Sequence, residues 1–133
     1  MIFKQEFDTK TSTYTYIIAS AKGREAVIID PVLENVEDYI SILKELDLKL
    51  VKVIDTHIHA DHITGASKLK QVTSCTTIMG EHTPADTVEI KVKDSEIIDI
   101  DNLKIRSMYT PGHTSDSYSF LLDNYLLYHT RKH

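Results

Sequence analysis

The chain has 133 residues, which is enough for one domain with a buried core and too few for two domains of ordinary size. Hydrophobic residues make up 41% and charged residues 26%, as in an ordinary globular protein, and no apolar run is long enough to span a bilayer. The formal net charge of −5 argues against nucleic-acid binding, because phosphate neutralisation needs grouped Lys and Arg. We therefore expect one domain over residues 1–133 that binds neither nucleic acid nor a membrane.

The start of the chain and its cysteine content bear on the compartment. Residues 1–6 read M-I-F-K-Q-E and lack the basic region and apolar run of a secretory signal. The single cysteine, Cys75, excludes an internal disulfide and is compatible with a reducing compartment. No His or Lys adjoins Cys75, so we expect a packed thiol and not a nucleophile, in a cytoplasmic protein.

The first third of the chain predicts two strands, a third strand and a helix. Residues 2–7 and 13–19 are rich in β-branched and aromatic residues and flank a polar turn, which indicates a hairpin. Residues 26–29 are continuously apolar, as in a strand covered on both faces. Residues 36–46 repeat apolar side chains at helical spacing, with Asn35 as a candidate N-cap.

The rest of the chain predicts a further helix among short strands. The helix is expected from Ile63 onward, where apolar residues recur on one face. The order of strands and helices favours an α/β layered fold. The strands are predicted over residues 50–54, 76–79, 88–92, 96–100, 103–109, 118–122 and 125–128.

The stretch 56–62 reads T-H-I-H-A-D-H and places three imidazoles and a carboxylate at the carboxyl end of a predicted strand. Ligands gather at such strand ends in open α/β sheets. In an extended segment His57 and His59 point to the same side, whereas Asp61 and His62 fall where the chain turns into the next helix. Because imidazole and carboxylate are common metal ligands, the stretch predicts a metal site.

A second motif, T-P-G-H, adds a fourth imidazole after the strand predicted over residues 103–109. Pro111 restricts the backbone that leaves the strand, and Gly112 allows a close or left-handed backbone. We therefore expect His113 to be held on a stiff turn, as a further candidate metal ligand.

Together the two motifs resemble the T-H-x-H-x-D-H and T-P-G-H elements of the metallo-β-lactamase superfamily. Within that superfamily the chain is more similar to the persulfide dioxygenases than to the glyoxalase II thioesterases, on stretches 12–16, 27–32 and 59–65. Glyoxalase II proteins usually have another His between the first two and a Gly-Gly pair after the last. This chain has Ile58 and Thr64 at those places.

The resemblance implies a fold and a boundary. The family domain is an αβ/βα sandwich, and the chain resembles about its N-terminal half. We therefore expect an α/β mixed sheet with flanking helices, truncated at the C-terminus. Such a half exposes the apolar sheet face that its partner layer covers, which predicts a homo-oligomer or a complementing chain on that face.

The resemblance also implies a ligand set. In the dioxygenase group a single Fe(II) is held by the residues that match His57 and His113, and by the Asp of a later Thr-Gly-Asp element. This chain has Arg131 at the place of that Asp and ends soon afterwards. A guanidinium repels a metal ion that a carboxylate binds, so impaired activity is expected.

The other residues of the first motif have a role that differs between branches. In hydrolytic members the residues that match His59, Asp61 and His62 bind zinc, and in the dioxygenases they orient ligands or the substrate. We keep all of them as candidate metal ligands and Asp61 as the candidate catalytic residue. A further departure is Asp116, where the family usually has Gly, a change that a left-handed backbone tolerates.

Three functional alternatives stay open. The first is a persulfide dioxygenase-like protein that uses Fe(II) and converts glutathione persulfide to sulfite and glutathione. The second is a zinc-dependent hydroxyacylglutathione hydrolase, favoured by the intact His59, Asp61 and His62, with a glutathione thioester as substrate. The third is a non-catalytic truncated remnant, for which the chain would be no enzyme at all.

Overall fold

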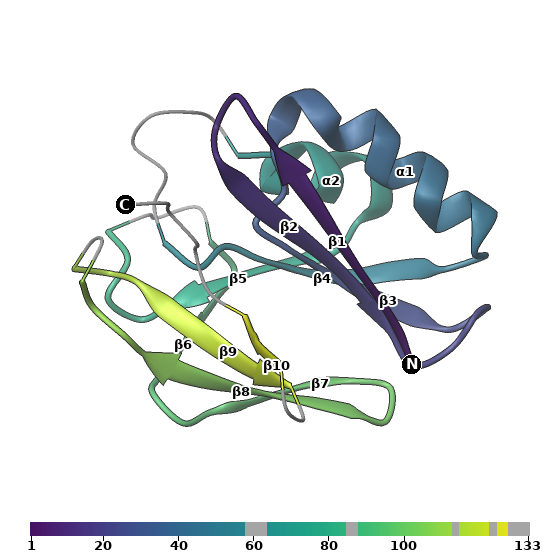
Figure 1. The fold of residues 1–133 in the computed structure, drawn as a ribbon. Helices are drawn as coiled ribbons and strands as arrows, with labels where there is room; N and C mark the ends of the chain where they lie inside the picture. Colours follow the sequence, from purple (N-terminus) through teal and green to yellow (C-terminus); the bar gives the residue numbers. More distant parts are fainter. Residues whose placement is uncertain (58–63, 85–87, 113–114, 123–124, 128–133) are drawn as a thin grey trace.

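The computed structural model describes residues 1–57, 64–84, 88–112, 115–122 and 125–127, which form two β-sheets and two α-helices (Figure 1). The sheets pack face to face, and both helices lie on the outer face of the larger sheet. This arrangement confirms the predicted α/β sandwich architecture. None of the helices in the described ranges is long and apolar enough to cross a membrane.

The larger sheet has the strand order β1-β2-β3-β4-β5-β6. The pairings from β1 to β3 are antiparallel, as the predicted hairpin requires, and those from β3 to β6 are parallel. The parallel strands therefore end at one edge of the sheet. The bounds are β1 Ile2–Asp8, β2 Thr13–Ala19, β3 Glu25–Ile29, β4 Lys49–Ile54, β5 Thr76–Gly80 and β6 Ile90–Val92.

The smaller sheet is antiparallel throughout, in the order β10-β9-β8-β7. Strands β7 and β8 alternate buried and exposed side chains, which is the pattern of a sheet with one covered face, whereas β9 is buried at nearly every position. The bounds are β7 Ile97–Ile100, β8 Leu103–Tyr109, β9 Tyr118–Leu122 and β10 Tyr125–Leu127.

Two helices follow β3 and β4. Helix α1 spans Val36–Glu45 after a short 3-10 turn, Leu33–Asn35, and buries its apolar stripe against the sheet. Asn35 is the N-cap residue, but its side chain bonds to Asp8 Oδ1 at 3.0 Å and makes no capping hydrogen bond. Helix α2 spans Ala66–Thr73, so the prediction of a helix from Ile63 placed its start too early.

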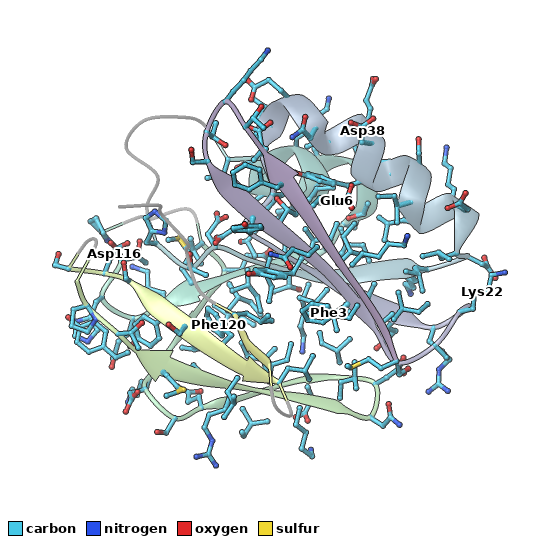
Figure 2. The ribbon with its side chains drawn as sticks, viewed as in Figure 1. Phe3, Glu6, Lys22, Asp38, Asp116 and Phe120 are labelled. Carbon is cyan, nitrogen blue, oxygen red and sulfur yellow. The ribbon has the colours of Figure 1, made fainter. Side chains whose placement is uncertain are left out.

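The core consists of two apolar clusters on opposite faces of the larger sheet. One lies between that sheet and the helices and includes Ile17, Ile28 and Leu69. The other lies between the two sheets and includes Ile29, Ile105 and Phe120 (Figure 2 labels Phe120). Consecutive residues of β3 are buried because the strand is covered on both faces, as its continuous apolar run predicted.

The inner face of the larger sheet is covered within the chain, so a partner on the sheet face left open by the missing half stays a prediction for another face. Strands β7 to β10 cover the inner face, and their inward side chains Ile98, Ile100 and Leu122 are 4% exposed or less. The alternation of buried and exposed residues in β7 and β8 is typical of such a second sheet, because an alternating strand needs only one apolar neighbour.

Polar contacts join the two sheets at the end away from the predicted site. The carboxylate of Asp101, in the β7–β8 turn, accepts hydrogen bonds from Arg24 at 3.1 Å and from the Glu25 amide at 3.0 Å. Lys52 Nζ donates to the Asp99 carbonyl at 2.6 Å. These contacts hold the second sheet across the first and thereby set where β8 and β9 end.

Candidate metal centre

The first motif begins where β4 ends, inside the protein. Thr56 and His57 are 0% and 2% exposed, so the imidazole is removed from bulk water before any ligand binds. Their placement follows from β4, whose apolar residues run between the two core clusters and carry the chain into the interior. A buried imidazole requires a polar partner, and its partners decide which ring nitrogen can bind a metal.

Asp30 organises this strand end from the neighbouring strand. Its amide donates to the Ile54 carbonyl at 2.7 Å and its carbonyl accepts from the Thr15 hydroxyl at 2.7 Å. The backbone of Asp30 is left-handed, with φ 56°, a conformation that Asp tolerates better than most residues. The turn after β3 therefore aims the Asp30 carboxylate at the end of β4.

The Asp30 carboxylate accepts two hydrogen bonds from Thr56. The Thr56 amide donates to Oδ1 and the Thr56 hydroxyl donates to Oδ2, each at 2.7 Å. The Thr56 hydroxyl also lies 3.0 Å from His57 Nδ1. A hydroxyl has one proton, and here that proton goes to Asp30, so Thr56 Oγ1 accepts from a protonated His57 Nδ1. The lone pair of His57 then lies on Nε2, which is the nitrogen that can bind a metal.

The far side of the first motif is held by the same turn. Thr64 forms an antiparallel bridge with Val32, and the Gly65 amide donates to the Pro31 carbonyl at 2.8 Å. A Cβ on Gly65 would lie 2.8 Å from Val36 and 3.2 Å from Pro31, so only glycine fits without a shift. The turn after β3 thus anchors both ends of the segment between residues 57 and 64.

The second sheet brings the second motif to the same place. The Tyr118 amide, at the start of β9, donates to the Thr56 carbonyl at 2.8 Å. Thr110 is tied to the strand that follows it, because its amide donates to the Ser117 carbonyl and its hydroxyl lies 2.7 Å from Ser119 Oγ. Thr110, the first residue of the T-P-G-H element, is therefore held next to the strand that contacts Thr56.

Three ring side chains, those of His82, Tyr109 and Tyr118, pack together at the start of the second motif. Tyr109 stacks on His82 with ring centroids 4.0 Å apart and lies 5.3 Å from Tyr118. The Tyr109 hydroxyl donates to the Ser115 carbonyl at 2.7 Å across the base of the loop. The Tyr118 ring packs against Gly80, where a Cβ would clash with it. These contacts join the loop after β8 to the end of β5.

Neither Gly112 nor Asp116 has a left-handed backbone. Gly112 has no positive φ, and a Cβ there would meet no atom within 4 Å in the described part of the chain. The described geometry therefore contains no steric need for glycine at this position. Asp116 is buried, at 5% exposed, and has no positive φ, so the left-handed backbone that would favour Asp in place of Gly is not present there.

Of the candidate ligands, His57 is the one that the structure describes. His59, Asp61, His62 and His113 lie outside the described residues, and so does Arg131. Within the described ranges, no group of three or more His, Cys, Asp and Glu side chains could hold a metal. The fit to a metal therefore rests on His57, whose buried position and fixed tautomer suit an imidazole ligand.

Sequence reasoning missed Asp30 and Thr56 as parts of the site. Asp30 is 26 positions from Thr56, and no spacing rule connects them. The available signal was the Asp-Pro pair at the end of a buried strand, since parallel strands end at one edge and their terminal residues meet there. Cys75 matches its prediction: it is 2% exposed, and burial raises the pKa of its thiol.

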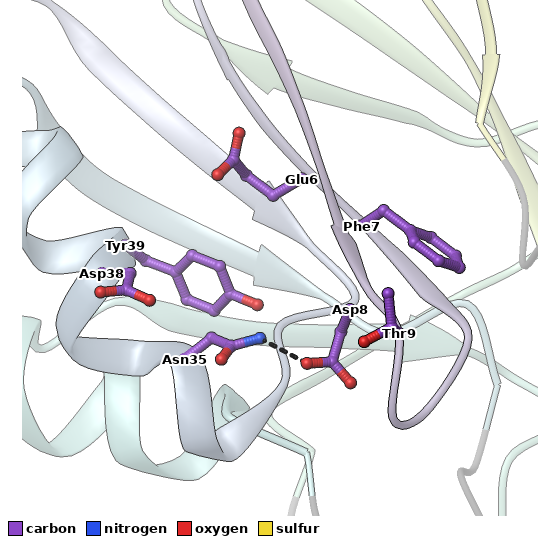
Figure 3. A pocket seen from close by; sticks show the side chains of 7 residues that line it. All are labelled: Glu6, Phe7, Asp8, Thr9, Asn35, Asp38 and Tyr39. Atoms are coloured by element: carbon purple, nitrogen blue, oxygen red, sulfur yellow. Dashed lines mark hydrogen bonds between the residues drawn. The ribbon is translucent and has the colours of Figure 1, made fainter.

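A hollow elsewhere on the surface does not form a second site. It has a volume of about 210 Å³ and lies between β1 and α1, with acidic side chains around it (Figure 3). Three of its polar side chains already bond within the chain, because Asn35 donates to Asp8 and the buried Tyr39 hydroxyl accepts from the Val32 amide at 3.1 Å. Burial raises the pKa of Tyr39, so this hydroxyl stays neutral.

Comparison with known proteins identifies the family. The family model described as the metallo-beta-lactamase superfamily matches residues 8–87, from the end of β1 to beyond β5. The chain belongs to the metallo-beta-lactamase superfamily. Membership implies a metal cofactor and explains why the chain concentrates histidines at the end of β4.

Several members of the superfamily are similar to this chain over most of its length. A persulfide dioxygenase ETHE1 of Mus musculus is 34% identical over 93% of this chain and 49% of its own length. The crystal structure of ETHE1 from Myxococcus xanthus has a TM-score of 0.90 and 42% identity, and covers 95% of this chain and 56% of that one. A hydroxyacylglutathione hydrolase of Prochlorococcus marinus is 34% identical over 76% of this chain and 40% of its own length. The chain spans about half the length of the curated relatives it matches.

Proposed function

We propose that this chain carries the metal-binding part of a persulfide dioxygenase, which converts glutathione persulfide, dioxygen and water to sulfite and glutathione at Fe(II). The observation that carries the proposal is the likeness to ETHE1 of Myxococcus xanthus, at 42% identity and a TM-score of 0.90 over 95% of this chain. The mouse protein named persulfide dioxygenase ETHE1 supports the same branch.

The geometry around His57 supports a metal role. Thr56 and Asp30 hold the imidazole in the tautomer that directs the Nε2 lone pair away from the hydrogen-bonded side. We propose His57 and His113 as iron ligands, because the start of the T-P-G-H element is held next to the strand that contacts Thr56. Bound iron would supply the reactivity toward dioxygen that the side chains lack.

The other motif residues are proposed to act around the metal. His59, Asp61 and His62 would orient the ligands or the persulfide sulfur, and Asp61 is the candidate for holding a proton. The resemblance implies a carboxylate ligand where this chain has Arg131. We therefore propose slower turnover than in the relatives, because a guanidinium contributes repulsion where a carboxylate contributes a bond.

The proposal is tested with protein loaded anaerobically with Fe(II). Oxygen uptake and sulfite formation are then measured on glutathione persulfide, with His57→Ala and zinc-loaded protein as controls. We expect uptake with iron alone, sulfite in a one-to-one ratio to oxygen consumed, and neither signal from His57→Ala. Iron bound at one equivalent without oxygen uptake would remove the assignment.

The alternative enzyme is a zinc-dependent hydroxyacylglutathione hydrolase. It is favoured by the 34% identity to the Prochlorococcus marinus protein of that name, and by the presence of His59, Asp61 and His62. It predicts that zinc-loaded protein hydrolyses S-lactoylglutathione, which is followed by the loss of thioester absorbance. No turnover at millimolar substrate would exclude this alternative.

The third alternative, a non-catalytic protein, is separated from both enzymes by metal content. Elemental analysis of the purified protein distinguishes iron, zinc and no metal before any assay is made. A protein that binds neither ion with a dissociation constant below about 10 μM would favour the non-catalytic alternative, because structural and catalytic metal sites bind far more tightly.

A further inference from the structure

Strand β1 lies at the edge of the larger sheet, with β2 as its hydrogen-bonded neighbour (Figure 1). It is seven residues long and contains neither Pro nor Gly. The second row of amides and carbonyls on an edge strand points away from the sheet and can pair with another strand. Phe7 is 46% exposed on this strand, so part of its ring is available to a second strand.

The sequence of β1, I-F-K-Q-E-F-D, is complementary to its own reverse. If two copies run antiparallel with Gln5 facing Gln5, then Lys4 of each copy faces Glu6 of the other. In the same register Phe3 of each copy faces Phe7 of the other. Opposite charges and aromatic pairs are the cross-strand neighbours that stabilise antiparallel strands.

The side chains of β1 divide between the two faces as this pairing requires. Phe3 and Phe7 contact Tyr16 and Tyr14 of β2, with ring centroids 5.8 Å and 4.7 Å apart. Glu6 lies on the other face, beside α1 (Figure 3). A two-fold axis perpendicular to the sheet leaves each side chain on the same face of the combined sheet. The Phe3–Phe7 pairs then lie on the same face as the Phe–Tyr contacts between β1 and β2 of each copy. The Lys4–Glu6 pairs lie on the opposite face, beside the helices.

Two charged residues at the middle of β1, Lys4 and Glu6, are available for pairing with another strand. In the described part of the chain neither Lys4 nor Glu6 forms an ion pair, and Glu6 is exposed. A lysine on an edge strand usually opposes pairing with other strands. Here an identical strand supplies the opposite charge at the matching position.

Charge also selects one register. Shifting the second copy by two residues in one direction places Lys4 against Lys4, and shifting it in the other direction places Glu6 against Glu6. Like charges directly opposite each other destabilise a strand pair. Only the register centred on Gln5 has two attractive charged pairs and none that repel.

We propose that two copies of this chain associate through antiparallel pairing of their β1 strands, so that the two larger sheets form one continuous sheet. The interface contains Phe3, Lys4, Gln5, Glu6 and Phe7 of each copy. It lies on the edge opposite to β6 and does not involve the candidate metal ligands. The inference therefore stands apart from the proposed function.

The test is the oligomeric state of the purified chain and of charge-reversed variants, measured by sedimentation velocity between 1 and 100 μM. Lys4→Glu places Glu against Glu6, and Glu6→Lys places Lys against Lys4, so each single variant should raise the dimer dissociation constant by about tenfold or more. An equimolar mixture of the two single variants should form heterodimers. The double variant K4E/E6K should form homodimers again, because its pairs are restored in reverse.

Matched controls make the same charge changes away from β1. Lys22 is exposed in the turn between β2 and β3, and Glu45 is exposed at the end of α1. The substitutions Lys22→Glu and Glu45→Lys should therefore leave the dimer dissociation constant unchanged. Thermal melts followed by circular dichroism show whether each single variant is folded. If a single variant does not fold, the oligomeric state of the double variant K4E/E6K still tests the proposal.

Either of two results would overturn the proposal. One is a wild-type chain that stays monomeric at 100 μM. The other is a dimer whose dissociation constant is unchanged in both Lys4→Glu and Glu6→Lys, or a dimer that both substitutions abolish and that an equimolar mixture of the two variants does not restore. Such a dimer would use another surface, such as the outer face of the smaller sheet.

Discussion

Asp30 accepts both the amide and the hydroxyl hydrogen of Thr56, at 2.7 Å each, although the two residues end different strands of the larger sheet. The pair connects a left-handed turn to the residue before His57. Its consequence is chemical as well as structural, because the direction of the Thr56 hydroxyl determines which nitrogen of His57 carries a proton.

The substitution Asp30→Asn should reverse that direction. Asn tolerates the left-handed backbone, and its amide group would donate to the Thr56 hydroxyl, which would then donate to His57 Nδ1. The proton of His57 would move to Nε2 and block metal binding. Long-range ¹H–¹⁵N spectra of the imidazole report the tautomer, and a chelator competition reports metal affinity. An unchanged Nδ1–H tautomer with unchanged affinity in Asp30→Asn would contradict the account.

Removing the hydroxyl alone should weaken metal binding less severely. Thr56→Val keeps the shape and loses the acceptor for His57 Nδ1–H, so we expect metal affinity to fall by about 10- to 100-fold. Thr56→Ser keeps the hydroxyl and should bind nearly as well as the wild type. Thr76→Val, in β5, is the matched control for the loss of a threonine hydroxyl. Equal affinities of Thr56→Val and Thr56→Ser would show that the hydroxyl does not position His57.

The contact between Gly80 and the Tyr118 ring should be sensitive to a single methyl group. A Cβ on Gly80 would clash with the ring, which is itself 1% exposed and has no room to retreat. We expect Gly80→Ala to lower the free energy of unfolding by about 1 to 3 kcal/mol, as overpacked cores do. Urea denaturation measures it. Gly112→Ala, with no described atom within 4 Å of the new Cβ, should change it by less than about 0.5 kcal/mol.

Stability at low pH should depend on Asp101. The hydrogen bond from Arg24, together with that from the Glu25 amide, lowers the pKa of Asp101. A carboxyl whose pKa is lower in the folded than in the unfolded state stabilises the fold above about pH 4, and this contribution is lost as the pH falls through the lowered value. The melting temperature of the wild type should therefore be higher than that of Asp101→Asn at pH 7. The difference between the two melting temperatures should disappear as the pH falls below about 4.

The control for this pH dependence is Asp47→Asn. Asp47 has the same left-handed backbone, with φ 53°, on an exposed turn, so the variant removes one carboxylate without touching the Arg24 contact. Melting temperatures between pH 3 and pH 7 would be compared for the three proteins. A gap between wild type and Asp101→Asn that is constant over this range would contradict the assigned ion pair.

The thiol of Cys75 should react only when the protein opens. It is 2% exposed between the larger sheet and the helices, and burial raises its pKa, so little reactive thiolate is available. We expect Ellman's reagent to react at pH 7 at least about 100-fold more slowly with native than with urea-unfolded protein. Because the chain has a single cysteine, Cys75→Ser serves as the blank. Rapid reaction of the native thiol would contradict the burial.

Sequence patterns were sufficient to predict most of the helices and strands. The β-branched and aromatic strand over residues 13–19, the buried run at 26–29 and the helical stripe of α1 were all predicted close to their observed bounds. Local periodicity records which face of an element is apolar, and that information is contained in neighbouring residues. The same holds for the motif residues around His57, whose residue types and spacing indicate a metal site and whose motif resembles that of a superfamily.

Tertiary structure decided which elements face each other and which groups complete the site. The second sheet covers the first because Ile98, Ile105 and Phe120 face the larger sheet, and periodicity does not name the partner of an apolar face. Asp30 reaches Thr56 only through the parallel pairing of β3 with β4. The sequence by itself determined that the chain places several histidines, the candidate metal ligands, after a strand end. Hydrogen bonds between residues distant in sequence decided the tautomer of His57, because they depend on strand register and turn geometry that spacing does not specify.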